Sequence, residues 1–190
     1  MYNLPAVIFA GGKSSRMGRD KALLPFKEYT TLSAYQYHKL SQLFSAVYLS
    51  AKEDKFDFTC KVIEDRYEEH SPLVGLLSLF EVLDDDALFI LSVDAPLVDK
   101  DVIEKLVDAY INSPEYDAII AQSPKGIQPL CGIYSRSIIP LIQDYLKHNK
   151  HKLTALLQES HVCYIEFDKE LPFSNLNTPQ EYKSTLLLNQ

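Results

Sequence analysis

Short apolar runs alternate with longer segments of helical periodicity along this chain. The expected strands cover residues 4–10, 46–50, 61–64, 87–93, 117–122, 126–134 and 161–167. The expected helices cover residues 31–44, 73–83 and 137–147, and two more begin after Asp99 and near Pro179. Such alternation is typical of βαβ units, in which helices cover a mainly parallel sheet. We therefore expect an α/β three-layer sandwich with a mainly parallel, Rossmann-like sheet and with ligands at the carboxyl ends of its strands.

The size and the charge of the chain limit its organisation and its partners. Its 190 residues, 46% of them hydrophobic, suffice for one well-packed domain, so we expect a single domain over residues 1–190. A net charge of -7 argues against broad binding to nucleic acid or to an anionic membrane, because both need extended basic surfaces. Cys60, Cys131 and Cys163 lack metal-site or redox spacing, and the N-terminus is unlike a signal peptide. We expect buried, reduced thiols and a cytoplasmic protein.

A segment rich in glycine and cations follows the first apolar run. Gly11 and Gly12 offer backbone that can approach a ligand closely, while Arg16 and Lys21 offer positive charge to phosphates. The segment is not a P-loop, because Val7 stands where that motif needs glycine, and its glycine spacing does not match the dinucleotide fingerprint. A plain turn would explain the glycine pair alone. With the cations included, the pattern predicts a phosphate-binding loop.

Two carboxylates follow expected strands in the same manner. Asp94 comes directly after the apolar run 87–93, and Asp65 follows a shorter strand. An ionised side chain next to a buried strand needs a partner, and a magnesium ion on Asp94 could bridge to nucleotide phosphates. A turn before Pro96 is the alternative for Asp94. For Asp65 the alternatives are a turn or an ion pair with Arg66.

Several motifs of the chain occur together in one known family. They are the loop Ala10-Gly11-Gly12-Lys13-Ser14-Ser15-Arg16-Met17-Gly18-Arg19-Asp20-Lys21, the segment Pro72-Leu73-Val74-Gly75, the strand Gln128-Pro129-Leu130 and the loop Asn175-Leu176-Asn177-Thr178-Pro179. This set resembles the molybdenum cofactor guanylyltransferases, which belong to the nucleotide-diphospho-sugar transferase superfamily. Asp94, two residues before Pro96, resembles the metal-binding position of that family. The resemblance implies the Rossmann-like sheet of that superfamily.

The resemblance also implies a reaction and its residues. The reaction is a magnesium-dependent transfer of GMP from GTP to the terminal phosphate of molybdopterin that carries molybdenum, with release of pyrophosphate. The implied catalytic residues are Asp94, which also binds the metal, Lys21 and Arg16. The implied nucleotide-binding residues are Phe9, Ala10, Gly11, Gly12, Lys21, Asp65, Gly75 and Asp94. The implied acceptor-binding residues are Gln128, Asn175, Asn177 and Lys152.

The partners that follow are GTP and molybdopterin as substrates, and molybdoenzymes or their chaperones as recipients of the product. We expect a monomer or a weak homo-oligomer. Guanine rather than cytosine as the base depends largely on Gly12. The enzymatic alternatives are therefore a cytidylyltransferase or a nucleotidyltransferase for a sugar or alcohol phosphate. The non-enzymatic alternative is a nucleotide-binding regulatory module.

Three segments keep alternative interpretations. Ser50 and Lys52 stand in a segment where the family often has asparagine, so a nucleotide contact there stays open. The basic stretch 147–152 is either a solvated face or a guide for the acceptor phosphate through Lys150 or Lys152. Near the end of the chain, Asn175 and Asn177 either face a ligand together or belong to a turn in which Asn177 and Thr178 cap the last helix.

Overall fold

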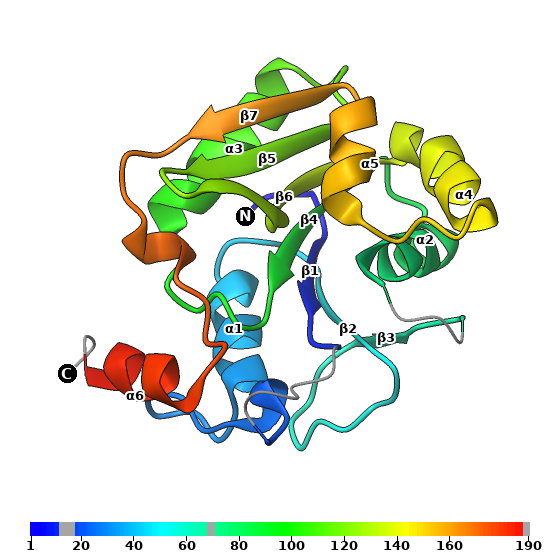
Figure 1. The fold of residues 1–190 in the computed structure, drawn as a ribbon. Coiled ribbons are helices and arrows are strands. Elements are labelled where there is room, and N and C mark those ends of the chain that lie inside the picture. Colours follow the sequence, from blue (N-terminus) through cyan, green and yellow to red (C-terminus); the bar gives the residue numbers. More distant parts are fainter. Residues whose placement is uncertain (12–17, 68–70, 188–190) are drawn as a thin grey trace.

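The computed structural model describes residues 1–11, 18–67 and 71–187, and within them seven strands form one sheet (Figure 1). The strands are β1 (Ala6–Phe9), β2 (Val47–Ala51), β3 (Val62–Glu64), β4 (Ala87–Ser92), β5 (Ala118–Ser123), β6 (Gly126–Ser135) and β7 (Val162–Glu166). Their order across the sheet is β3-β2-β1-β4-β6-β5-β7. Strand β6 runs antiparallel to β4 and β5, and the other neighbouring pairs run parallel. The expected α/β fold with a mainly parallel sheet is confirmed.

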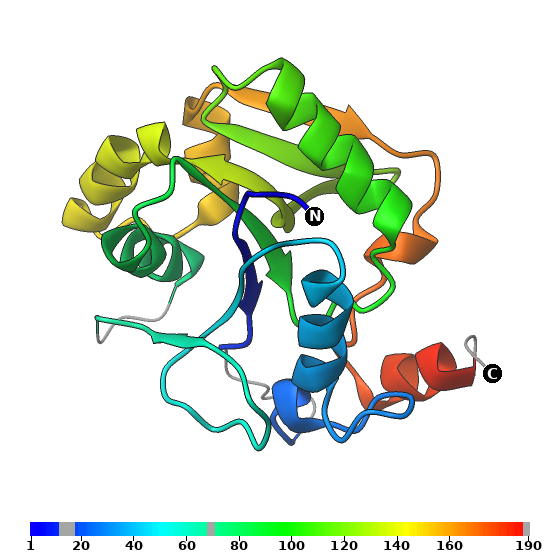
Figure 2. The ribbon, with the colours of Figure 1, turned by 180° about the vertical axis from the view of Figure 1, so that it is seen from behind.

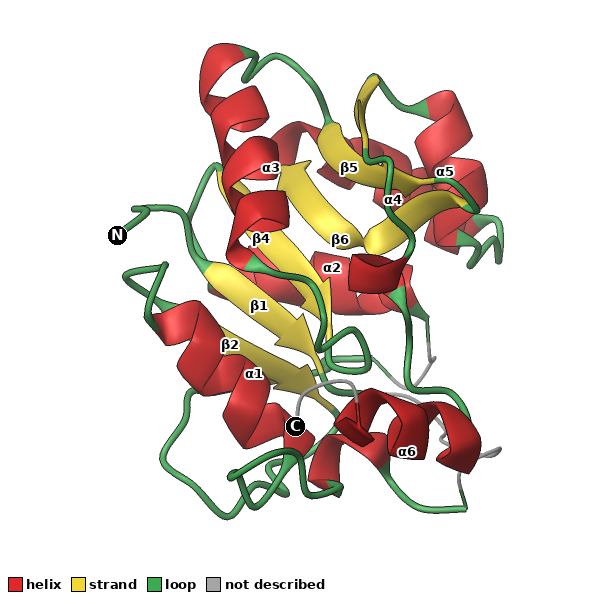
Figure 3. Cartoon of the chain, turned by 90° about the vertical axis from the view of Figure 1, so that its left-hand side faces the viewer, coloured by secondary structure: helices red, strands yellow, loops and turns green. Residues whose placement is uncertain are grey.

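Helices cover both faces of this sheet. Helices α1 (Leu32–Ser41) and α3 (Lys100–Asn112) lie on one face and stand in front of it in Figure 2. Helices α2 (Pro72–Val82), α4 (Ile139–Lys147) and α5 (Leu153–Glu159) cover the other face, and Figure 3 shows the layers from the side. Helix α6 (Pro179–Leu187) lies outside both helical layers, where the Tyr182 hydroxyl donates to the Pro25 carbonyl. This arrangement is the expected three-layer sandwich.

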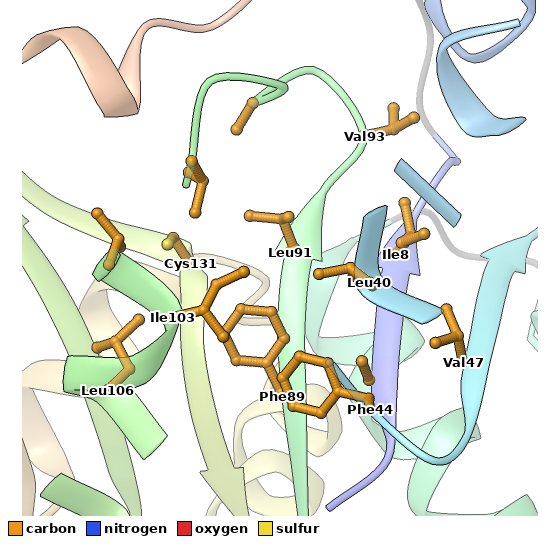
Figure 4. Close-up of a cluster of buried hydrophobic side chains, with 14 of the residues drawn as sticks. Ile8, Leu40, Phe44, Val47, Phe89, Leu91, Val93, Ile103, Leu106 and Cys131 are labelled. Atoms are coloured by element: carbon orange, nitrogen blue, oxygen red, sulfur yellow. The ribbon is translucent and has the colours of Figure 1, made fainter. Parts of the chain in front are cut away.

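Strand β4 is the centre of the sheet and is apolar on both faces. Phe89 and Leu91 point into the core under α1 and α3, whereas Leu88 and Ile90 belong to the core under α2, α4 and α5. Figure 4 shows the first of these cores, in which the Phe89 ring stacks on Phe44 with 5.0 Å between centroids. A strand buried on both faces has no alternation of apolar and polar residues. This is why residues 87–91 appear in the sequence as one continuous apolar run.

The antiparallel strand β6 follows from its short connection to β5. Ser123 pairs with Gly126, so only two residues join the strands, and a link that short allows only an antiparallel hairpin. Along β4, the pairing with β6 extends only to Leu91 and Cys131. Residues 126–130 of β6 therefore extend past that pairing, toward the edge of the sheet where the parallel strands end.

Most expected boundaries agree with the structure to within a few residues, and the expected caps are present. The side chains of Thr31 and Asp99 accept from backbone N–H groups at the starts of α1 and α3. Helix α5 was not expected from the sequence. It has seven residues and no side-chain N-cap. Its stability comes from the burial of Leu153, Leu156 and Leu157, which is a tertiary contact and not a property of the local sequence.

Two other observations concern the cysteines and the membrane. Cys131 is buried as expected, but Cys60 and Cys163 are partly exposed, so the expectation of burial is wrong for these two thiols. All three are free. Among the described helices, none has the length and apolar character needed to cross a bilayer.

Candidate active site

A cavity of about 560 Å³ lies at the edge of the sheet where the parallel strands end. Phe9 and Gly11 line it from the end of β1, Ser50 from β2 and Ser92 from the end of β4. Asp65, which follows β3, lines it as well. Because the carboxyl ends of parallel strands meet at one edge, residues far apart in the sequence come together here.

A second cavity of about 440 Å³ adjoins the first, and both are lined by Pro72, Ser92 and Leu130. Three residues expected on the acceptor side line this second cavity: Gln128, Lys152 and Asn175. Asp94 also lines it. The protruding start of β6 thus forms part of the boundary between the two spaces, and Asp94 lies next to that boundary.

Asp94 takes part in a network of short polar contacts. Its Oδ2 atom lies 2.8 Å from Nζ of Lys21, and its Oδ1 atom accepts a 2.6 Å hydrogen bond from Ser92. The Lys21 ammonium also donates to Oδ1 of Asn177 at 2.7 Å. The side chains of Lys21 and Asp94 are each 17% exposed, so the ion pair is largely shielded from water. Two oxygen atoms therefore converge on one cation at the edge of the sheet.

The start of α6 places Asn177 in this network. Glu181 accepts from the backbone N–H of Asn177 at 2.9 Å and from that of Thr178 at 2.8 Å. The Thr178 hydroxyl accepts from the backbone N–H of Glu181 at 3.2 Å, which completes a capping box. The hydroxyl of Thr178 and the two backbone donors hold the pKa of Glu181 below its usual value. The N–H of Leu176 donates to the carbonyl of Asp94 at 2.8 Å, so this loop is also tied to the end of β4.

Phe9 and Gly75 meet at the floor of the first cavity. A Cβ atom on residue 75 would lie 2.7 Å from Cε1 of Phe9 and 3.2 Å from Cζ. Only glycine lets the Phe9 ring pack this closely against α2. The sequence motif around Gly75 and the end of β1 therefore form one surface, which both residues present to the cavity.

Lys55 is a site residue that the sequence reasoning missed. Its Nζ atom lies 2.5 Å from Oδ2 of Asp20 and donates to the carbonyl of Ala10 at 3.2 Å. Asp20 in turn caps the 3-10 helix Lys21–Leu23 by accepting from the N–H of Ala22. Lys55 thus connects the end of β1 to the turn that presents Lys21. The only available signal was a second lysine shortly after Lys52, in the segment that follows β2.

Some of the expected site residues lie outside the described part of the chain, and others make contacts that the sequence did not predict. Gly12 and Arg16 lie outside the described residues. Ala10 is 3% exposed and lies at the end of β1. The amide of Gln128 donates to Oγ of Ser123 at 3.0 Å, so it is held within the β5–β6 hairpin while it lines the second cavity. In the basic stretch, the Lys150 ammonium lies 4.9 Å from the centre of the Tyr145 ring.

The donor atoms around Asp94 suit a hard cation. Within the described ranges, no group of three His, Cys, Asp or Glu side chains could hold a metal ion by itself. The oxygens of Asp94 and Asn177 nevertheless already converge on the Lys21 ammonium. Mg²⁺ prefers oxygen ligands, and it commonly takes few from the protein and the others from phosphates and water. The residues present therefore fit a magnesium ion that arrives with a nucleotide.

Known proteins with similar sequences belong to one family. A family model described as "MobA-like NTP transferase domain" matches residues 6–163. A protein named molybdenum cofactor guanylyltransferase from Campylobacter jejuni subsp. doylei is 38% identical over 185 residues, which cover 96% of this chain and 95% of that protein. A protein of the same name from Helicobacter pylori strain G27 is 32% identical over 95% of this chain and 90% of that protein.

Two crystal structures show the same fold. Molybdopterin-guanine dinucleotide biosynthesis protein A from Archaeoglobus fulgidus superposes with a TM-score of 0.83, at 19% identity and over 98% of each chain. CMP:2-keto-3-deoxy-manno-octonic acid synthetase, in a complex with CTP, superposes with a TM-score of 0.78 at 14% identity. The second alignment covers 99% of this chain and 98% of that one. At these identities the likeness concerns the fold alone.

Proposed function

This chain belongs to the family of MobA-like NTP transferases and molybdenum cofactor guanylyltransferases, and from this premise we propose the reaction that it catalyses. The chain transfers GMP from GTP to the terminal phosphate of molybdopterin that carries molybdenum. The products are the guanine dinucleotide form of the cofactor and pyrophosphate. The observation that carries the proposal is the pair of adjoining cavities, one lined by Phe9 and Gly75 and the other by Lys152 and Asn175, with Asp94 beside their boundary.

The chemistry needs one new bond and the loss of another. A phosphate oxygen of the acceptor forms a bond to the α-phosphorus of GTP, and the bond from that phosphorus to the oxygen bridging to the β-phosphate breaks. The acceptor phosphate is already ionised at neutral pH, so no strong general base is required. The rate then depends on positioning and on neutralising the charge of the phosphates.

The residues of the site each have a role in this proposal. Lys21 would exchange its contact with Asp94 for a contact with the phosphates, to which its ammonium offers charge-assisted hydrogen bonds. Asp94, together with Asn177, would hold a magnesium ion. When bound, that ion would neutralise phosphate charge. Arg16 lies outside the described residues, so its assignment to the phosphates rests on its place in the glycine-rich loop of the sequence and on the family resemblance.

The nucleoside would lie against Phe9 and Gly75, with Asp65 also in the wall of the cavity. On the other side, Lys152 would offer positive charge to the acceptor phosphate while Asn175 supplies polar contacts. Asn177 remains assigned to the acceptor as well, although its amide contacts Lys21 in the ligand-free protein. Guanine as the base rests on the named relatives and on Gly12, which lies outside the described residues.

The test is direct. Purified protein is incubated with Mg²⁺, molybdopterin carrying molybdenum, and GTP, CTP or UTP in separate reactions. The proposal predicts pyrophosphate release and a guanine dinucleotide with GTP only. A cytosine dinucleotide would support the cytidylyltransferase alternative. In parallel reactions a sugar or alcohol phosphate replaces molybdopterin, and release of pyrophosphate only in these would support the other enzymatic alternative. Tight binding of GTP without turnover would favour a regulatory module.

Further points belong to the same proposal and need their own measurements. They are the single-domain organisation over residues 1–190, the cytoplasmic location, the monomeric or weakly oligomeric state, and the transfer of the product to molybdoenzymes or their chaperones.

A further inference from the structure

The turn that carries Asp94 is held from one side by two residues of α1. Gln36 and Lys39 lie three positions apart, so they share one face of that helix. The Gln36 amide donates to the carbonyls of Ser92 and Val93 at 3.4 and 3.3 Å. The Lys39 ammonium donates to the carbonyls of Pro96 and Val98 at 3.2 and 2.9 Å. The two side chains therefore bind carbonyls on both sides of Asp94.

Other contacts complete the support of this turn. The carbonyl of Asp94 accepts from the N–H of Leu176 at 2.8 Å, and that of Ser92 also accepts from the N–H of Ala95 at 3.2 Å. The apolar part of the α1 contact is visible in Figure 4, where Leu40 points toward Leu91. The backbone around Asp94 is thus fixed by donors from α1 and from the loop before α6.

Gln36 is not a residue that protein stability alone would favour at this position. The residue is fully buried, and its NH₂ group must face the two carbonyls because they can only accept hydrogen bonds. As a result its Oε1 atom has no hydrogen-bond partner among the described residues. A buried acceptor without a partner costs free energy, which an apolar side chain of similar size would avoid.

Lys39 is also costly to bury. It donates to backbone carbonyls and forms no ion pair with a carboxylate among the described residues, although the charge of Asp99 attracts it from a longer distance. Burial lowers the pKa of Lys39 to about 7, which shows that the charged form of this side chain is unfavourable at its position. A lysine that is costly to bury and whose hydrogen bonds go to the turn around Asp94 is better explained by the position of Asp94 than by packing.

We propose that Gln36 and Lys39 are positioning residues for nucleotidyl transfer, because they hold the turn of residues 92–98 so that Asp94 keeps its place beside Lys21 and Asn177. The part of this inference that concerns catalysis rests on the proposed function. The part that concerns the turn does not, since it can be measured in the ligand-free protein.

The experiment compares Gln36→Met and Lys39→Met with Lys27→Met as the matched control. Lys27 is exposed, donates to the Tyr35 hydroxyl at 3.3 Å, and lies 4.9 Å from the ring that Lys39 approaches to 5.5 Å. Its substitution removes the same charge next to the same ring but leaves the turn untouched. Three quantities are measured: hydrogen exchange of the amides of residues 92–98 without ligand, kcat and KM for GTP, and the melting temperature.

Both variants should exchange these amides faster than the wild type. Their kcat should fall by about 10- to 100-fold, as expected when a reacting group moves by about an ångström, with KM for GTP changed far less. Gln36→Met should keep its melting temperature, and Lys39→Arg should recover most of the activity because its guanidinium can donate to both carbonyls. The control should match the wild type.

Unchanged exchange, or unchanged kcat in folded protein, would overturn the proposal, as would a loss of melting temperature with no other effect. If Lys39→Met does not fold, Gln36→Met decides the question by the same criteria. A wild type that transfers no GMP would contradict the proposed function instead, and the exchange data would still decide whether α1 holds the turn.

Discussion

Lys21 and Asp94, 73 positions apart in the sequence, form an ion pair with 2.8 Å between Nζ and Oδ2. The Lys21 ammonium neutralises the carboxylate of Asp94. Without it, a largely shielded negative charge would lie unpaired at the end of β4. The ion pair also means that the atoms expected to bind a metal ion and those expected to bind phosphates neutralise each other. To bind, a nucleotide and its metal ion would therefore have to break the ion pair, with the phosphates taking Lys21 and the metal ion taking Asp94.

This exchange of partners predicts opposite effects of removing Lys21. Lys21→Met should strengthen Mn²⁺ binding to the ligand-free protein by about fivefold, equivalent to about 1 kcal/mol for a partly exposed ion pair. The same change should weaken GTP binding by at least about tenfold, because a charge-assisted contact to phosphate is lost. Mn²⁺ titration followed by electron paramagnetic resonance, and GTP titration by calorimetry, measure the two affinities.

Asp94→Asn is the companion variant. It keeps the size of the side chain but removes the charge, so it should weaken Mn²⁺ binding and lower kcat by at least about 100-fold with the fold intact. Weaker Mn²⁺ binding in Lys21→Met would show that the ammonium does not compete with the metal ion. Full activity of Asp94→Asn would remove this residue from the metal site.

A second prediction uses the contact between Gly75 and Phe9. Gly75→Ala places a Cβ atom 2.7 Å from the Phe9 ring, so the ring must move at the floor of the first cavity. We expect the KM for GTP to rise about tenfold with little change in the free energy of unfolding, because the end of the ring can shift. Steady-state kinetics and urea unfolding measure these quantities.

Gly132→Ala serves as the control for that variant. Its Cβ atom would overlap the carbonyl oxygen of Ile119 inside the sheet, where the backbone cannot give way. This change should cost about 2 kcal/mol of stability and leave the KM of the folded fraction unchanged. A lowered stability with unchanged KM in Gly75→Ala would mean that the Phe9 ring does not touch the nucleotide.

The parts of the site that the sequence predicts are those next to a strand end or inside a compact motif. Asp94 directly follows the most apolar run, and Gly75 belongs to a four-residue segment, so both could be identified without a structure. Helix α5 could not, because a seven-residue helix without a side-chain cap has almost no periodicity to detect.

The supports of the site were hidden for a different reason. The Gln36 and Lys39 side chains bind carbonyls 56 to 59 positions away, and a carbonyl is present at every position whatever its side chain. No pattern of residue types marks such a contact. Asn177 likewise reaches Lys21 across 156 positions, and only the closing of the chain around the sheet brings the two together.

A third prediction concerns the dependence of stability on pH. Burial lowers the pKa of Lys39 from 10.5 to about 7 and raises that of the Cys131 thiol from 9.0 to about 12. Between pH 7 and 9 the folded protein has lost the Lys39 proton that the unfolded chain retains, so this group makes stability rise with pH. Above pH 9 the unfolded chain loses the Cys131 proton that the folded protein retains, so this group opposes the Lys39 rise and the stability should level off up to about pH 10.5.

Urea unfolding at intervals between pH 6.5 and 10.5 measures both slopes. Lys39→Met should remove the rise between pH 7 and 9 and leave a fall above pH 9, whereas Cys131→Ala should let the rise continue to about pH 10.5. Lys27→Met should keep both slopes and move the start of the rise to a slightly higher pH, because the Lys27 charge contributes to the lowering of the Lys39 pKa. A wild-type slope in Lys39→Met would show that another group titrates in this range.

A fourth prediction separates two lysines of the basic stretch 147–152. Lys152 lines the second cavity, whereas the Lys150 ammonium lies over the Tyr145 ring at 4.9 Å. Lys152→Ala should raise the KM for the acceptor by about tenfold and make that KM less dependent on salt, because a cation facing the acceptor phosphate is lost. The KM for GTP should stay close to the wild-type value, since Lys152 does not line the first cavity.

Lys150→Ala removes the same charge two residues away and should leave both KM values unchanged. Equal effects of the two variants would mean that the stretch attracts the acceptor only by its overall charge, and no effect of either would place the acceptor phosphate elsewhere in the second cavity.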